Sequence, residues 1–182
     1  MKVNISRAAE LFFPNPSLEA VFVEATANSI DAGATRIDIT IKIEEFSKVD
    51  TLSVRISDNG TGFTEENFFK FSSLLESKKD DHKGIGRLVF MSYFKDVKVT
   101  SNFENYQRKF TYNDDFDETS DLTETESAGP STTLHFTGYR KDKVKSYDYL
   151  KPSSLKKTLM FHFFPLFYER MLKQEELTIG IH

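Results

Sequence analysis

Glu24, Asn28 and Asp31 follow one another at the spacing of successive helical turns. Residues 17–32 predict the helix that carries them, with Ser17 as its N-cap and a glycine as its stop signal. An amide one turn from a carboxylate can hold a hard divalent cation while the carboxylate orients a water for in-line attack. The helix alone leaves a second interpretation open, because the solvated face of an amphipathic helix is equally polar.

A short motif, Asp58-Asn-Gly-Thr-Gly62, comes directly after a predicted strand. Alternation of apolar and polar residues over 51–57 indicates that strand. An acid at a strand end can accept a hydrogen bond from an exocyclic amine, and the bare backbone of Gly60 and Gly62 lets a planar base lie close. Asn-Gly alone would indicate a tight turn, but its place after the polar helix favours a binding site.

Two further motifs contain groups suited to phosphate. Lys83-Gly-Ile-Gly-Arg87 precedes an apolar segment, and paired glycines at the start of a helix leave backbone N–H groups free for an anion. Ser131, Thr132 and Thr133 place hydroxyl groups at the start of an alternating strand, where they can bind a phosphate or a water near the base. Each of these two motifs is weak evidence by itself.

Taken together and in this order, the four motifs resemble those of the GHKL ATPases, a superfamily named for gyrase, the heat-shock chaperone, histidine kinases and MutL. Residues 24–31 are similar to its N-box, 58–62 to its first glycine box, 84–86 to its second and 131–133 to its terminal threonine motif. The N-box is most similar to that of MutL-type proteins, whereas the second glycine box is closer to the chaperone-like form. The resemblance spans about residues 5–165.

The resemblance implies a role for each matching residue. Glu24 is implied as the general base for the attacking water, and Asn28 as the ligand of a magnesium ion that bridges the phosphates of ATP. Asp58 is implied to accept the adenine amino group, with room for the base at Gly60 and Gly62.

The remaining implied residues surround the nucleotide. Thr132 is implied to lie by a water on the adenine side. Asp31 matches a motif acid that supports the site, and we expect it to bond neighbouring backbone or Arg36. The residues implied to bind or cover the phosphates are Lys83, Gly84, Ile85, Gly86 and Arg87.

The resemblance also implies the Bergerat ATP-binding fold, an α/β (α+β) two-layer sandwich in which helices cover one face of a mixed sheet. We expect an ATP-binding domain over 1–171, with an ATP lid at about 72–83 and an acidic loop at about 113–127. Residues 172–182 are expected to start a following strand or domain. Helices are expected at 17–32, 64–71, 84–93 and 152–171, and strands at 35–46, 50–58, 96–102, 106–113, 132–139 and 177–181.

Composition sets limits on the class of protein. The 182 residues suit one domain with a good core, to which 18 phenylalanines contribute. The absence of cysteine excludes disulfides and thiolate metal sites, and with no signal peptide or membrane-spanning segment we expect a soluble, cytoplasmic protein with no membrane partner.

Charge is distributed unevenly around a net value of −4. Both charged segments are more often solvated than functional, although the basic one could contact nucleic acid. Asn113–Ser127 holds the acids Asp114, Asp115, Asp117, Glu118, Asp121, Glu124 and Glu126. The segment after the strand predicted at 132–139 holds the bases Arg140, Lys141, Lys143, Lys145, Lys151, Lys156 and Lys157.

These features predict a magnesium-dependent ATPase whose nucleotide state drives a conformational change or dimerisation of a larger protein. We expect slow turnover by this chain alone, because no lysine matches the one that many members supply from a following domain. Two alternatives are a nucleotide-sensing interaction module with negligible hydrolysis and a kinase-like phosphoryl donor. Asp31-Ala-Gly disfavours the kinase.

Overall fold

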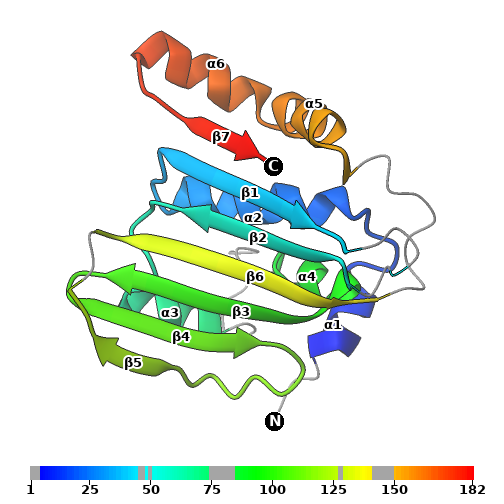
Figure 1. The fold of residues 1–182 in the computed structure, drawn as a ribbon, viewed down its shortest axis with the longest axis vertical. Coiled ribbons are helices and arrows are strands. Elements are labelled where there is room, and N and C mark those ends of the chain that lie inside the picture. Colours follow the sequence, from blue (N-terminus) through cyan, green and yellow to red (C-terminus); the bar gives the residue numbers. More distant parts are fainter. Residues whose placement is uncertain (1–4, 45–47, 49–50, 74–84, 127–128, 141–149) are drawn as a thin grey trace.

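The protein is built on one seven-stranded mixed sheet with the strand order β5-β4-β3-β6-β2-β1-β7 (Figure 1). The computed structural model describes residues 5–44, 48, 51–73, 85–126, 129–140 and 150–182. Neighbouring strands are antiparallel except for β7, which is parallel to β1. The strands are β1 (Arg36–Lys42), β2 (Ser53–Asp58), β3 (Phe94–Phe103), β4 (Tyr106–Tyr112), β5 (Asp121–Glu124), β6 (Ser131–Tyr139) and β7 (Thr178–Ile181).

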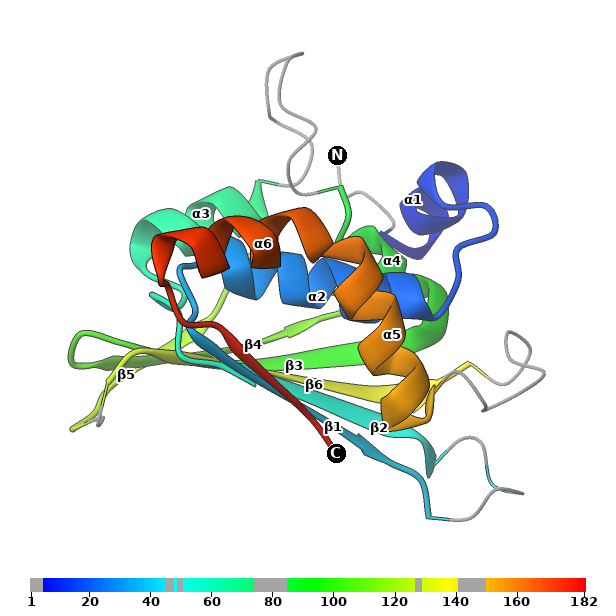
Figure 2. The same cartoon turned by 90° about the horizontal axis from the view of Figure 1, so that it is seen from above.

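Helices lie on one side of this sheet, so the expected two-layer sandwich is confirmed (Figure 2). The core fills the space between the two layers, and alternation along each strand decides which side chains enter it. In β2, Val54, Ile56 and Asp58 all point inward and are buried. The helices are α1 (Ile5–Phe12), α2 (Glu19–Asp31), α3 (Glu65–Ser72), α4 (Leu88–Tyr93), α5 (Pro152–His162) and α6 (Phe164–Lys173).

The predicted N-cap of the first long helix was wrong. Leu18 occupies the cap position of α2 without a side-chain cap bond. Ser17 lies one residue earlier, and its carbonyl accepts a hydrogen bond from the N–H of Ala20 at 3.1 Å. Leu18 is buried, with 2 % of its surface exposed, and this packing explains why the chain already turns at residues 17–20, before the helix begins. The helix α1 was not expected, because only Ile5 and Ala9 of its eight residues are buried and so short a pattern carries little periodicity.

Two helix boundaries also differ from expectation. The helix expected at 152–171 is two helices that meet at Phe163, since Pro165 lacks the N–H that a continuous helix would need. The helix expected from residue 84 begins at Leu88.

The acidic segment expected to be a loop at 113–127 contains the edge strand β5. All four residues of β5 are exposed, so backbone pairing with β4 forms this strand without any apolar pattern in its sequence.

Residues 172–182 hold the end of α6 and the strand β7. Ile37 and Ile39 of β1 pair with Ile179 and Ile181, so β7 is an edge strand of the same sheet. The lid expected at 72–83 lies outside the described residues from position 74 onward, and Ser72 ends α3.

Candidate nucleotide site

A cavity of about 820 Å³ lies between the sheet and the helices α2 and α3. Its size falls in the range of small-molecule sites. The cavity brings together residues from all four sequence motifs, although these are more than 100 positions apart at the extremes. The expected site residues that line it are Glu24, Asn28, Asp31, Asp58, Gly62, Arg87 and Thr132.

Glu24 and Asn28 occupy adjacent turns of α2 at one end of the cavity. Asn28 Nδ2 donates a hydrogen bond to Glu24 Oε1 at 3.2 Å. Burial raises the pKa of the Glu24 carboxyl above its ordinary value and nearby Asp31 adds to this, while the bond from Asn28 and the charge of Arg87 oppose it. A carboxylate with a raised pKa beside an amide has the character of a general base.

Asp58 also lines the cavity, from the inward face of β2. Its Oδ2 accepts from Ser29 Oγ at 2.9 Å, and its Oδ1 accepts from the Gly60 N–H at 2.9 Å. Burial raises the pKa of this carboxyl, against these two hydrogen bonds. A carboxylate has about four acceptor sites, so about two remain on Asp58, which lines the cavity, for an amine to use.

Thr132 stands beside Asp58 because the two are paired residues of β6 and β2. The Thr132 hydroxyl is 3.1 Å from Ser101 Oγ, which also accepts from the Phe63 N–H at 2.8 Å. A hydroxyl therefore lies next to the carboxylate among the residues that line the cavity.

The glycines after Asp58 are required by contacts within the chain itself. A Cβ on Gly60 would fall 2.9 Å from the Cβ of Ala32. Gly62 has φ +77°, and a Cβ there would be 2.6 Å from the Asn102 carbonyl oxygen. Room for a base at these glycines stays a prediction, since neighbouring strands and helix already explain why both lack a side chain.

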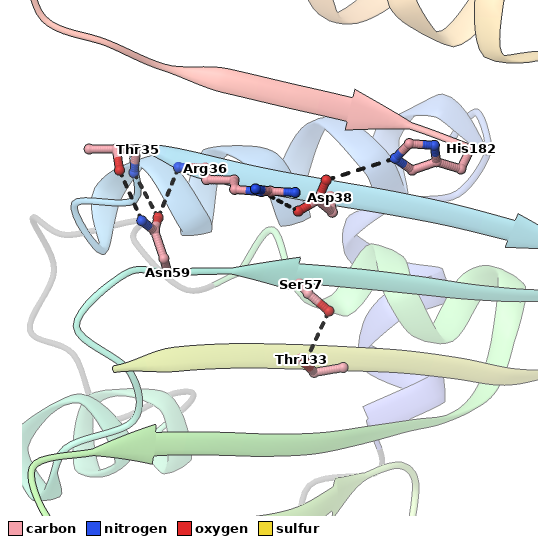
Figure 3. A network of polar contacts seen from close by, with 7 residues as sticks. All are labelled: Thr35, Arg36, Asp38, Ser57, Asn59, Thr133 and His182. Carbon is pink, nitrogen blue, oxygen red and sulfur yellow. Dashed lines mark hydrogen bonds and ion pairs between the residues drawn. The ribbon is translucent and has the colours of Figure 1, made fainter. Parts of the chain in front are cut away.

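Asn59, between the acid and the glycines, fastens this loop to the start of β1 (Figure 3). Its Oδ1 accepts from the backbone N–H groups of Thr35 and Arg36 at 2.9 and 2.8 Å, and its Nδ2 donates to Thr35 Oγ1 at 2.9 Å. The N–H of Thr61 donates to the carbonyl of Ala32 at 2.9 Å. These bonds hold the Asp58 loop against the end of α2.

The second glycine element lies against the catalytic candidate. A Cβ on Gly86 would fall 2.1 Å from Glu24 Oε2, so the glycine and the carboxylate are in direct contact. Ile85 packs against the core, whereas Lys83 and Gly84 lie outside the described residues. The N–H groups of residues 88–90 donate to the carbonyls of residues 85–87, so these N–H groups are already used within the turn.

Arg87 brings a buried cation into the cavity. The residue is 5 % exposed, and its guanidinium carbon lies 4.2 Å from the centre of the Phe71 ring. Its Nε and Nη2 are buried without a hydrogen-bond partner among the described residues. Burial lowers the pKa of Arg87, against the opposing influence of Tyr112 and Glu24. Buried donors without a partner need an acceptor, and a phosphate oxygen would supply one.

The structure corrects one interpretation of a polar residue and adds a contact for another. Arg36 bonds Asp38 through Nε at 2.8 Å, so the alternative in which Asp31 pairs with Arg36 was wrong, while a bond from Asp31 to neighbouring backbone stays a prediction. Ser29 is buried on α2 and its hydroxyl donates to Asp58, a contact that the sequence analysis did not predict.

Sequence reasoning also missed the apolar wall of the cavity. Strand alternation places its valines inward, but no signal in the sequence separates the wall of a cavity from the rest of the core. The wall consists of Phe63, Phe71, Phe90, Val97, Val99, Tyr112 and Leu134.

Comparison with known families agrees with this geometry. Residues 16–144 match the family described as histidine kinase-, DNA gyrase B- and HSP90-like ATPases. The chain belongs to this family. The family match covers α2, the Asp58 loop, the second glycine element and β6, so it includes every wall of the cavity. A search of curated proteins found no match.

Membership of this ATPase family implies that the domain binds adenine nucleotides. Within the described ranges, none of the helices has the length and apolar character needed to cross a lipid bilayer.

Proposed function

We propose that the cavity binds ATP together with Mg²⁺ and that Glu24 activates water for hydrolysis. The observation that carries the proposal is that two kinds of polar group line one cavity. Asp58, Ser29 and Thr132 form an acceptor-rich group suited to adenine, while Glu24 and Asn28 form a group suited to phosphates. Family membership supports the same assignment.

The donor set at the phosphate end fits a magnesium ion. Because Asn28 bonds Glu24 through its amide nitrogen, its carbonyl oxygen is available as a hard ligand. Mg²⁺ commonly takes one or two protein oxygens and fills its other positions with waters and substrate phosphates. When bound, the ion would neutralise charge on the phosphate oxygens.

In the hydrolysis step, Glu24 accepts a proton from water as the water oxygen bonds the γ-phosphorus. The bond between that phosphorus and the bridging oxygen breaks, so ATP and water become ADP and inorganic phosphate. Arg87 is placed to donate hydrogen bonds to the charged oxygens, and its buried surroundings strengthen them. Asn28 orients the carboxylate before the reaction.

Coupling of nucleotide to shape follows from the contact between Gly86 and Glu24. A γ-phosphate and its attacking water need space beside the Glu24 carboxylate. Gly86 occupies part of that space, on one side of the carboxylate. We therefore propose that ATP binding displaces the second glycine element and that this displacement drives self-association of the full-length protein. Solution mass measured with and without a non-hydrolysable ATP analogue tests the proposed self-association.

Glu24→Gln tests the proposed hydrolysis directly. This variant should retain ATP affinity while turnover falls by about 10²–10⁴-fold, the usual contribution of a general base. Glu10→Gln, an exposed site on α1, is the matched control. Unchanged turnover in Glu24→Gln would refute the catalytic role. ATP binding without turnover by the wild type would identify the nucleotide-sensing module instead.

A further inference from the structure

The face of the sheet that points away from the helices carries a row of basic side chains. Arg55 of β2 and His135 of β6 are paired residues, and His135 is in turn paired with Lys98 of β3. Lys42 of β1 lies diagonally next to Arg55, because its own partner on β2 is Ser53. Four strands therefore bring Lys42, Arg55, His135 and Lys98 together, and we refer to these four residues as the basic row.

The basic row is accessible and poorly neutralised. Lys42, Arg55 and Lys98 are exposed, and none of them forms an ion pair with another residue in the part of the chain that the structure describes. The pKa of His135 is lowered, first by partial burial and then by Arg55, Lys98 and Lys42. Lys42, Arg55 and Lys98 carry like charge around His135, so an anion bound here would relieve their mutual repulsion.

Acidic residues on the same face are engaged elsewhere. Asp38 bonds Arg36, and His182 Nε2 lies 3.8 Å from its Oδ1 (Figure 3). Asp96 accepts a hydrogen bond from Asn113 Nδ2 at 2.8 Å. Asp38 is thus paired with a cation, whereas Asp96 is bonded by a neutral amide and keeps its charge, so the three cations of the basic row outnumber the one remaining acid of these two.

Hydroxyl groups flank the basic row. Ser57 and Thr133 are paired residues of β2 and β6, and their hydroxyl oxygens lie 3.0 Å apart across the two strands (Figure 3). Thr100 of β3 continues the line, paired with Thr133. Hydroxyl groups beside Lys and Arg are the usual contacts to phosphate oxygens of nucleic acids.

We propose that this open sheet face binds the phosphodiester backbone of double-stranded nucleic acid without reading its sequence. Side chains of alternate residues on β1, β2, β6 and β3 form the face, and apart from the partly buried His135 the described ones there include no exposed aromatic ring on which an unpaired base could stack. Recognition would rest on charge, which is densest along a duplex. The surface lies on the opposite side of the sheet from the nucleotide cavity, so it is separate from the proposed ATPase site.

Fluorescence anisotropy with a labelled DNA duplex of about 20 base pairs tests the proposal over a series of salt concentrations. Binding should be weak, with a Kd on the order of 10⁻⁴–10⁻⁶ M, and the logarithm of the affinity should fall with the logarithm of salt concentration with a slope of about −3, as expected for about three phosphate contacts. A second duplex of unrelated sequence should bind equally well, and a single strand should bind no tighter.

The decisive variant is Arg55→Gln/Lys98→Gln, which should lower affinity at least 10-fold at low salt and reduce the salt slope by about 2. Lys156→Gln/Lys157→Gln removes the same charge from exposed positions of α5, in the basic segment that the sequence left open as a nucleic-acid contact, and should leave binding unchanged if the sheet face is the binding surface. ATP binding by both variants reports that the domain is folded. Equal losses in both variants, no binding by the wild type, or tighter binding to phosphatidylserine vesicles with the same dependence on Arg55 and Lys98 would each overturn the proposal.

Discussion

Gly86 lies in direct contact with the Glu24 carboxylate, because a Cβ added to Gly86 would fall 2.1 Å from Oε2. The contact joins two motifs separated by more than 60 residues and leaves the proposed base no freedom on that side. It also explains in terms of the chain's own packing why position 86 has no side chain.

Gly86→Ala should therefore act on catalysis more than on stability. The carboxylate is the end of a flexible side chain and can rotate away, so the fold is retained, but the displaced base should lose about 10²-fold or more in turnover. In a Glu24→Ala background the same substitution should cause no further loss. Steady-state ATP hydrolysis of the two single variants and the double variant measures this. Additive losses would show that Gly86 acts independently of Glu24.

Arg87→Met should weaken ATP binding without destabilising the domain. Methionine fills similar space over Phe71 without burying a charge, and replacement of a buried charge by a well-packed apolar group is often neutral or stabilising. Loss of charge-assisted hydrogen bonds to phosphate should reduce ATP affinity by about 10–100-fold. Calorimetry and thermal unfolding provide the two readouts. Arg55→Met, at an exposed position of the opposite sheet face, is the control and should bind ATP normally. Normal affinity in Arg87→Met would exclude a phosphate contact.

Asp58→Asn should separate stability from binding. The folded-state pKa of Asp58 is raised above the ordinary value of about 3.8, so its stabilising contribution is present below that value and is lost as pH rises through the folded pKa. The free energy of unfolding of the variant, relative to that of the wild type, should therefore increase as pH rises from the ordinary pKa to the folded-state pKa of Asp58. It should keep the increased value at neutral pH.

ATP affinity should fall about 10-fold or more in Asp58→Asn. The Gly60 N–H takes the one amide oxygen, which leaves an NH₂ group facing the adenine amine. Denaturant unfolding at several pH values and calorimetry measure the two effects. Ser57→Ala, on the other face of β2, is a control for nucleotide binding. Tight ATP binding by Asp58→Asn would remove Asp58 as the adenine acceptor.

The pH dependence of hydrolysis should report Glu24. A general base acts when deprotonated, so turnover should rise with pH through the folded pKa, which lies above the ordinary value of about 4.5. The charge of Arg87 holds this pKa down, and Arg87→Met should shift the rising limb to higher pH. The rate must be measured with saturating nucleotide, so that weaker binding does not distort the profile. An unchanged limb in the variant would mean that another group titrates.

The sequence by itself was sufficient to predict which polar side chains share a face within one helix or one strand. The i, i+4, i+7 spacing on α2 places Glu24, Asn28 and Asp31 in one stripe whatever surrounds the helix, and alternation along β2 carries Asp58 to the inward face. The fold class followed from the order of these elements and the family resemblance, and the sheet confirmed it.

Tertiary structure alone decided which groups meet. Ser29 reaches Asp58, Gly86 meets Glu24 and Arg87 is buried over Phe71 because the helices dock on the sheet in one arrangement, which short-range periodicity does not specify. The basic row depends likewise on the register of four strands, since Arg55, Lys98 and His135 occupy ordinary outward positions in their own segments. Periodicity determines the face on which a side chain lies, whereas its partners depend on long-range pairing that only the folded chain establishes.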